Sequence, residues 1–159
     1  MIIPFVFTFI LLYFLFSISK EDIKIMIISE NKLRLFGTFG ILYLICIGLS
    51  SKKINAIDLI INNFISMLIV FLMMYGLSFI SFKLLKINSL GFGDVKISSL
   101  SSIWLGLEMS FISLSISFIL SALYSLYGKI TKRFKTFHQY PFAPFLSIGI
   151  FCSWILDKI

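Results

Sequence analysis

The sequence is poor in charged residues and in the residues on which many enzyme centres depend. Of its 159 residues only 13% are charged, one is histidine and two are cysteine, whereas phenylalanine alone supplies 19. A soluble domain usually has about 25% charged residues. With a mean hydropathy of +1.05, the chain has the composition of a protein embedded in a lipid bilayer, so we expect membrane lipid around it.

The scarcity of reactive side chains excludes several kinds of catalysis. Cys46 and Cys152 stand alone in apolar stretches, and without a CxxC partner they are typical of small core residues. His138 is the single histidine, and neither an HExxH nor a GxSxG motif occurs. We therefore expect no metal, no cofactor and no serine nucleophile.

The net charge of +7 could suit a nucleic-acid partner, but the basic residues lie in short clusters between apolar runs. Membrane topology explains that pattern better, so we expect no nucleic acid. The stretch from Met1 to Ser19 lacks a basic start and a small-residue cleavage site, which favours a retained first span over a signal peptide.

The apolar runs predict the fold class, because a span needs about 20 residues and about 17 can suffice. The run at 97–127, uncharged except for Glu108, would extend about 46 Å as one helix, too long for a hydrocarbon core of about 30 Å. We therefore expect a break between Gly106 and Met109. The sequence predicts an all-α integral membrane protein, a single domain over residues 1–159 with six transmembrane helices. The expected spans are about 2–18, 35–50, 57–81, 97–106, 110–127 and 141–157.

Two rows of mostly small residues repeat every four positions and predict faces on which helices pack. The rows are Asp94, Ser98, Ser102 and Gly106, and then Ser113, Ser117, Ser121 and Ser125. Asp94 should therefore point into the bundle and not into lipid. We also expect Asn62 and Asn63 to form hydrogen bonds between helices, and Ser29 or Asn31 to cap the second helix.

Lysine and arginine are distributed unevenly between the two sets of connections. Those after the first, third and fifth spans hold 11 of the 14 basic residues, and the opposite side holds three. This bias predicts that the first set is cytoplasmic and that the N-terminus lies outside. Asp22 and Asp94 then lie on the cytoplasmic side.

Two acids at the same side of neighbouring helices can act as an aspartyl protease pair. One carboxylate of Asp22 and Asp94 would accept a proton from water while the other, protonated, polarises the scissile carbonyl, so the pair should share a proton. The alternative is that both are ordinary interfacial acids neutralised by lysines. The lysines near them are Lys20, Lys24 and Lys96.

Three motifs resemble those of one family, the type IV prepilin peptidases, which are integral-membrane aspartyl proteases. Gly91-Phe92-Gly93-Asp94-Val95-Lys96 resembles its GxGDxK motif, and Asp22-Ile23-Lys24 followed by Ile27 to Leu33 resembles its first-aspartate motif. The stretch from Tyr140 to Leu146, with Gly149, is similar to its Pro-Phe-Gly-Pro-Phe stretch. Ser29 and Ala143 depart from the family, which often has proline and glycine there. The motifs occur in the family's order over nearly the whole chain.

The resemblance implies a six-helix bundle of the GxGD aspartyl protease type, with Asp22 and Asp94 as the catalytic pair. It implies cleavage of the short basic leader from prepilins or pilin-like pseudopilins at the cytoplasmic side of the inner membrane. Members that also methylate the product carry a further cytoplasmic region, often with paired CxxC motifs. This chain lacks such a region, so we expect peptidase activity only.

Five further residues are candidates for substrate positioning or support of the active site. Gly91 and Gly93 would let the backbone approach the substrate closely. Lys96 would orient Asp94 or tune it electrostatically, or would simply extend toward the interface. Pro141 and Pro144 would either shape the site or start and kink a helix.

Two other functions remain open at the level of sequence. One is a membrane transporter or assembly subunit without enzymatic activity, in which Asp94 is a proton or ion site. The other is a relative of the peptidases that has lost activity.

Overall fold

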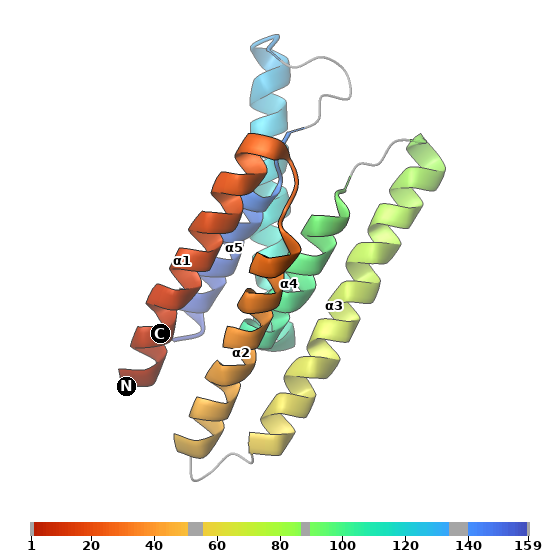
Figure 1. Cartoon of the computed structure of the whole chain (residues 1–159). Coiled ribbons are helices and arrows are strands. Elements are labelled where there is room, and N and C mark those ends of the chain that lie inside the picture. The colour runs from red at the N-terminus through yellow and green to blue at the C-terminus, as the bar shows by residue number, and fades with distance from the viewer. Residues whose placement is uncertain (1, 51–55, 87–89, 134–139, 159) are drawn as a thin grey trace.

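The structure is a computed structural model that describes residues 2–50, 56–86, 90–133 and 140–158, with every regular element in these ranges helical. The helices are α1 (Ile2–Ile25), α2 (Glu30–Ser50), α3 (Ala56–Leu85), α4 (Phe92–Ile130) and α5 (Ala143–Leu156) (Figure 1). Four of them are long and apolar enough to cross a membrane, and α5 is a shorter apolar helix. An all-helical architecture is confirmed, whereas the count of six spans stays a prediction.

The end of α1 lies further along the chain than expected. The sequence predicted a span over about 2–18 and a polar connection from Ser19 to Arg34, but the helix continues to Ile25 and α2 begins at Glu30. Charged residues tolerate a helical backbone well, so a helix can continue past the end of its apolar run. Met26 ends it with a positive φ of 51°. Asp22 therefore lies in the last turn of α1 and not in a loop.

Gly106 divides α4 into two arms that run in opposite directions. Its backbone has φ 74° and ψ −179°, a conformation open to glycine and costly for other residues. Trp104, before the break, packs against Trp154 in the last turns of α5, with ring centroids 5.9 Å apart. Phe118, after it, packs against Phe142 at the start of α5, at 5.4 Å. The chain reverses at the glycine where its length predicted a break (Figure 1).

The row of serines on the second arm of α4 is a packing face against α5, as predicted. Ser113, Ser117 and Ser121 are buried. A Cβ placed on Gly149 of α5 would lie 2.2 Å from Ser117 Oγ and 2.3 Å from the Ser113 carbonyl oxygen. The two backbones therefore approach so closely that a side chain larger than hydrogen does not fit.

The first arm of α4 is anchored to α2 and α3 at its far end. Trp104 stacks on Phe36 and donates its indole N–H to the Phe36 carbonyl oxygen at 3.1 Å. Asn63 of α3 donates its side-chain N–H to the carbonyl oxygen of Ile103 at 2.9 Å, which confirms the predicted bond between helices. Asn62 is exposed instead. These contacts fix the direction of the arm that begins near Asp94.

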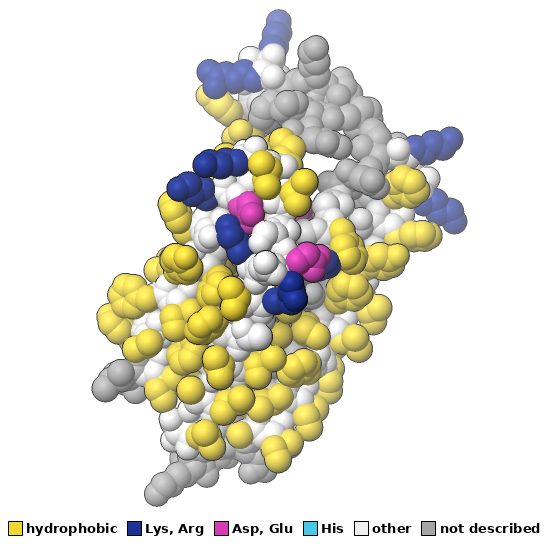
Figure 2. Space-filling model, in the orientation of Figure 1, with side chains coloured by type: hydrophobic (Ala, Val, Ile, Leu, Met, Phe, Trp, Pro, Cys, Tyr) yellow, Lys and Arg dark blue, Asp and Glu magenta, His cyan; other side chains and the backbone are white. Residues whose placement is uncertain are grey.

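On the face shown in Figure 2, the basic side chains are distributed unevenly. Lys and Arg side chains gather in the upper half of Figure 2, and hydrophobic side chains cover most of the lower half. The end of α1, the end of α3 and the start of α5 lie toward the upper end in Figure 1, whereas the start of α1 and the end of α5 lie toward the lower end. His138 lies outside the described residues.

Candidate active site

Asp22 of α1 is joined directly to the start of α5. Its side chain is buried, and its Oδ2 accepts a hydrogen bond of 3.0 Å from the backbone N–H of Ala143. Ala143 is the first residue of α5, and Pro144 follows it in the first turn. The first N–H groups of a helix have no partner within it and carry partial positive charge. The N–H of Ala143 therefore favours the charged form of Asp22, against the cost of burying that charge.

Asp94 lies in the first turn of α4 and is 9% exposed. Its carboxylate folds back toward Gly91, where an added Cβ would lie 3.1 Å from Asp94 Oδ2. Its other oxygen, Oδ1, is buried without a hydrogen-bond partner among the described residues. Buried polar atoms are nearly always satisfied, so this oxygen points to a water molecule or a bound group as its partner.

Both aspartates line one cavity of about 310 Å³. The other lining residues are Met26, Ile27, Ile28, Glu30, Leu33, Gly91, Phe92, Gly93 and Lys96. The structure thus brings together five of the seven candidate site residues that the sequence named. Pro141 and Pro144, although described, do not line the cavity.

Pro144 lies in the first turn of α5, the helix whose first N–H reaches Asp22. Proline suits the first turn of a helix, because the N–H that it lacks would have no partner there. Of the two readings left open by the sequence, the start of a helix is the one that the structure shows for this residue. The N–H just before it, on Ala143, reaches Asp22.

Gly93 has a packing role that the sequence did not predict. A Cβ at this position would lie 3.2 Å from Ile28 Cδ1, closer than most side-chain contacts. Ile28 belongs to the short connection between α1 and α2 and lines the cavity. The glycine therefore allows this connection to lie against the first turn of α4.

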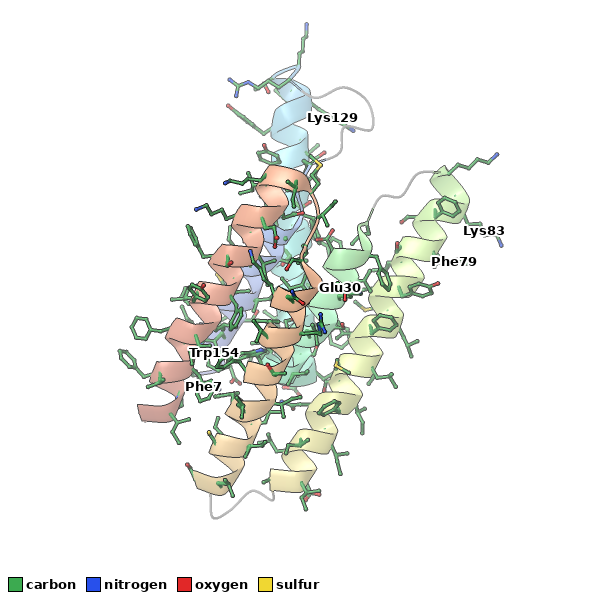
Figure 3. The ribbon with its side chains drawn as sticks, in the orientation of Figure 1. Phe7, Glu30, Phe79, Lys83, Lys129 and Trp154 are labelled. Atoms are coloured by element: carbon green, nitrogen blue, oxygen red, sulfur yellow. The ribbon has the colours of Figure 1, made fainter. Side chains whose placement is uncertain are left out.

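Lys96 pairs with Glu30 and not with Asp94. Its ammonium group forms an ion pair with Glu30 Oε1 and lies 4.8 Å from the centre of the Phe92 ring. Figure 3 shows Glu30 at the start of α2, beside the first arm of α4. Among the described residues no ion pair involves Asp22 or Asp94. The described lysines therefore do not neutralise the two aspartates through ion pairs.

A second group of polar contacts braces the connection beside Asp22. Ser29 Oγ accepts the backbone N–H of Lys32 at 3.4 Å, so Ser29 caps α2, as the sequence predicted. The N–H of Ser29 itself donates to Glu21 Oε2 at 3.3 Å, and Lys32 Nζ lies 3.1 Å from the same oxygen. These bonds hold the last turn of α1 against the first turn of α2.

The sequence indicated several groups of the site only weakly. Glu30 stood in the stretch compared with the first-aspartate motif, but no role followed from that. Met26, Ile27 and Phe92 are exposed apolar residues, which are common in such a chain. The Ala143 N–H is a backbone group, and no pattern of side chains could reveal it.

The geometry favours acid–base chemistry by the two carboxylates. Asp22 and Asp94 are buried, line one cavity and repel each other when both are charged, which favours one shared proton. Within the described ranges no group of three or more His, Cys, Asp or Glu side chains could hold a metal ion. Two acids and a water molecule suffice to hydrolyse a peptide bond.

Comparison with known families agrees with this geometry. A family model described as the type IV leader peptidase family matches residues 9–126. The chain belongs to this family. The match includes both aspartates and the glycines around Asp94, and it identifies the protein as a protease of the leader peptidase type. No match was found among curated proteins or among solved structures.

Proposed function

We propose that this leader peptidase is an aspartyl endopeptidase that removes the short basic leader from prepilins or pilin-like pseudopilins. Asp22 and Asp94 form its catalytic pair. The observation that carries this proposal is the shared cavity of two buried carboxylates, in a member of a leader peptidase family. Neither carboxylate forms an ion pair with a residue that the structure describes.

The different surroundings of the two aspartates support different roles. Asp22 receives the first N–H of α5, which favours the anion, so it is the base that takes a proton from the attacking water. Asp94 carries the shared proton and donates it to the scissile carbonyl oxygen, because its Oδ1 has no partner among the described residues. When the tetrahedral intermediate collapses, the C–N bond breaks and a proton passes to the leaving amine.

The remaining candidate residues support this pair from a distance. Gly91 leaves room for the Asp94 carboxylate, and Gly93 leaves room for Ile28. Lys96 holds Glu30 at the cavity. Pro144 lies in the first turn of the helix whose first N–H reaches Asp22, and Pro141 precedes that helix.

The charge pattern supports a location in the inner membrane with the active site facing the cytoplasm. In the sequence, 11 of the 14 basic residues fall after the first, third and fifth predicted spans. The end of α1, which holds Asp22, and the start of α4, which holds Asp94, lie toward the same end of the bundle as the end of α3 and the start of α5. Basic connections are retained in the cytoplasm. Counting the two arms of α4 separately gives six passes, with the N-terminus outside.

The proposal is tested by replacing each aspartate and following a co-expressed prepilin. Asp22→Asn and Asp94→Asn should each abolish removal of the leader while the protein stays in the membrane, with Asp157→Asn as a matched control. Asp157 lies just after α5 and pairs with Lys158. The measurement is the ratio of uncut to cut prepilin on an immunoblot. Processing at the wild-type level by either variant contradicts the catalytic pair.

The family match supports this function over a transporter in which Asp94 is an ion site. A transporter would move protons or cations into vesicles and lose that flux in Asp94→Asn, while the wild-type protein would cut no prepilin. A relative without activity would do neither.

A further inference from the structure

Acids outnumber bases among the residues of the cavity, although the chain as a whole has a net charge of +7. Asp22, Glu30 and Asp94 line it, and Lys96 is the single basic residue among the described residues of the lining. With one proton shared by the two aspartates, the lining still carries an excess of negative charge. A concave site of this sign attracts a cationic group.

The unpartnered oxygen of Asp94 is a second, independent sign of a ligand. Asp94 is 9% exposed, its Oδ1 has no hydrogen-bond partner among the described residues, and its side chain lines the cavity. Leaving a carboxylate oxygen buried and unsatisfied costs free energy. A bound peptide or the water that attacks it would satisfy this oxygen.

Glu30 is the acid that a ligand in this cavity can reach most easily. Its side chain is 67% exposed, whereas both aspartates are buried. Ion pairs at such exposed positions contribute little to stability, so their partners exchange readily. Lys96 also lies over the Phe92 ring, a contact that does not involve Glu30.

We propose that Glu30 determines specificity by binding a Lys or Arg side chain of the leader. The inference rests on the proposed function, since it takes the scissile bond to lie between Asp22 and Asp94. Because an extended peptide advances about 3.3 Å per residue, a leader side chain reaches Glu30 within a few residues of that bond. The exposed apolar residues Met26, Ile27 and Phe92 then receive the apolar segment that follows the bond.

The test compares two substrates that differ only in the charge of the leader. One is a prepilin with Lys and Arg in its leader, and the other has Gln at those positions. Wild-type protein should prefer the basic substrate in kcat/KM, and Glu30→Gln should reduce this preference about five- to tenfold, mainly through KM. Raising the salt concentration should also weaken the wild-type preference, because exposed charges are screened.

Charge reversal and a matched control make the test specific. Glu30→Lys should disfavour the basic leader further and should accept a leader with Glu at the same positions. Glu108→Gln removes an exposed acid of α4 that does not line the cavity, and it should keep the full preference. Equal loss of preference in Glu108→Gln would contradict a specific role for Glu30.

A binding measurement separates this inference from the catalytic proposal. Fluorescence anisotropy of labelled basic and neutral leader peptides, with the whole protein in lipid vesicles, needs no turnover. Tighter binding of the basic peptide that is lost in Glu30→Gln supports the inference even if nothing is cut, in which case the catalytic proposal alone fails. Equal binding of both peptides by the wild-type protein, or an unchanged preference in Glu30→Gln, overturns it.

Discussion

Asp22 and Asp94 are held by different means, although they line the same cavity. Asp22 is fixed from outside its own helix, by the N–H of Ala143, 121 positions later in the sequence. Asp94 is fixed locally, in the turn that Gly91 starts, where the Asp94 N–H donates to the Gly91 carbonyl oxygen at 3.0 Å. The local turn fixes where Asp94 lies, whereas the position of Asp22 relative to its donor depends on how α1 and α5 pack.

Replacing one residue of this turn should lower activity and leave stability almost unchanged. In Gly93→Ala the new Cβ would lie 3.2 Å from Ile28 Cδ1, so Ile28 must move within the cavity. Small displacements of substrate-positioning groups can lower catalysis strongly, so we expect processing to fall about tenfold or more. The thermal midpoint of the protein in detergent should change little.

Gly76→Ala is the matched control for this prediction. Gly76 lies within α3, and a Cβ there would meet nothing within 4 Å. Because alanine favours a helix over glycine by up to about 1 kcal/mol, this variant should keep full processing and be equally or more stable. Similar losses of processing in both variants would contradict a specific contact between Gly93 and Ile28.

At the scale of elements, the reversal of α4 brings Asp94, which lies on the first arm, near the start of α5. The first arm carries Asp94, and the second arm packs on α5 through Ser113, Ser117 and Gly149. α5 in turn supplies the N–H that Asp22 accepts. The reversal at Gly106 therefore connects the packing of the bundle to the geometry of the cavity.

Replacing the glycine at the reversal should destabilise the whole bundle. In Gly106→Ala a Cβ would lie 3.6 Å from Asn63 Oδ1, an ordinary contact, so the cost comes from the backbone at φ 74°. Residues other than glycine held in that region cost about 1–3 kcal/mol. Thermal unfolding in detergent should show a lower midpoint than for wild type or Gly76→Ala. An unchanged midpoint would mean that the chain relaxes away from this conformation.

At the scale of the whole molecule, the separation of charge along the bundle predicts its orientation. Lys24 lies at the end of α1 near the cavity, and Lys158 lies beyond α5 near the opposite end; both are exposed. If the basic end is cytoplasmic, a thiol at position 158 faces the outside and one at position 24 does not.

Labelling of intact cells tests this orientation. In a background with Cys46 and Cys152 replaced by serine, a membrane-impermeant maleimide should label Lys158→Cys and should leave Lys24→Cys unlabelled until the cells are opened. Labelling of Lys24→Cys alone in intact cells would reverse the proposed topology. Processing by each variant, measured in parallel, shows that the proteins compared are folded.

Composition and residue spacing were sufficient to predict the features of this protein that depend on local sequence. Hydropathy predicted long apolar helices, and four of the described helices are long and apolar enough to cross a membrane. Helix length predicted the break near Gly106, and the spacing of four predicted the face of Ser113 and Ser117. The helix α1 continues to Ile25, past the predicted span over about 2–18, because charged residues end an apolar run without ending a helix.

The two aspartates and the glycines beside Asp94 were named from the sequence, and they line one cavity, whereas their catalytic role stays a prediction. What surrounds them was decided by tertiary structure alone. Lys96 meets Glu30 and not Asp94, Gly93 faces Ile28, and Asp22 meets the first N–H of α5. Each of these contacts joins segments far apart in the chain, and the rotation of each helix about its axis, set by packing against its neighbours, determines which atoms meet.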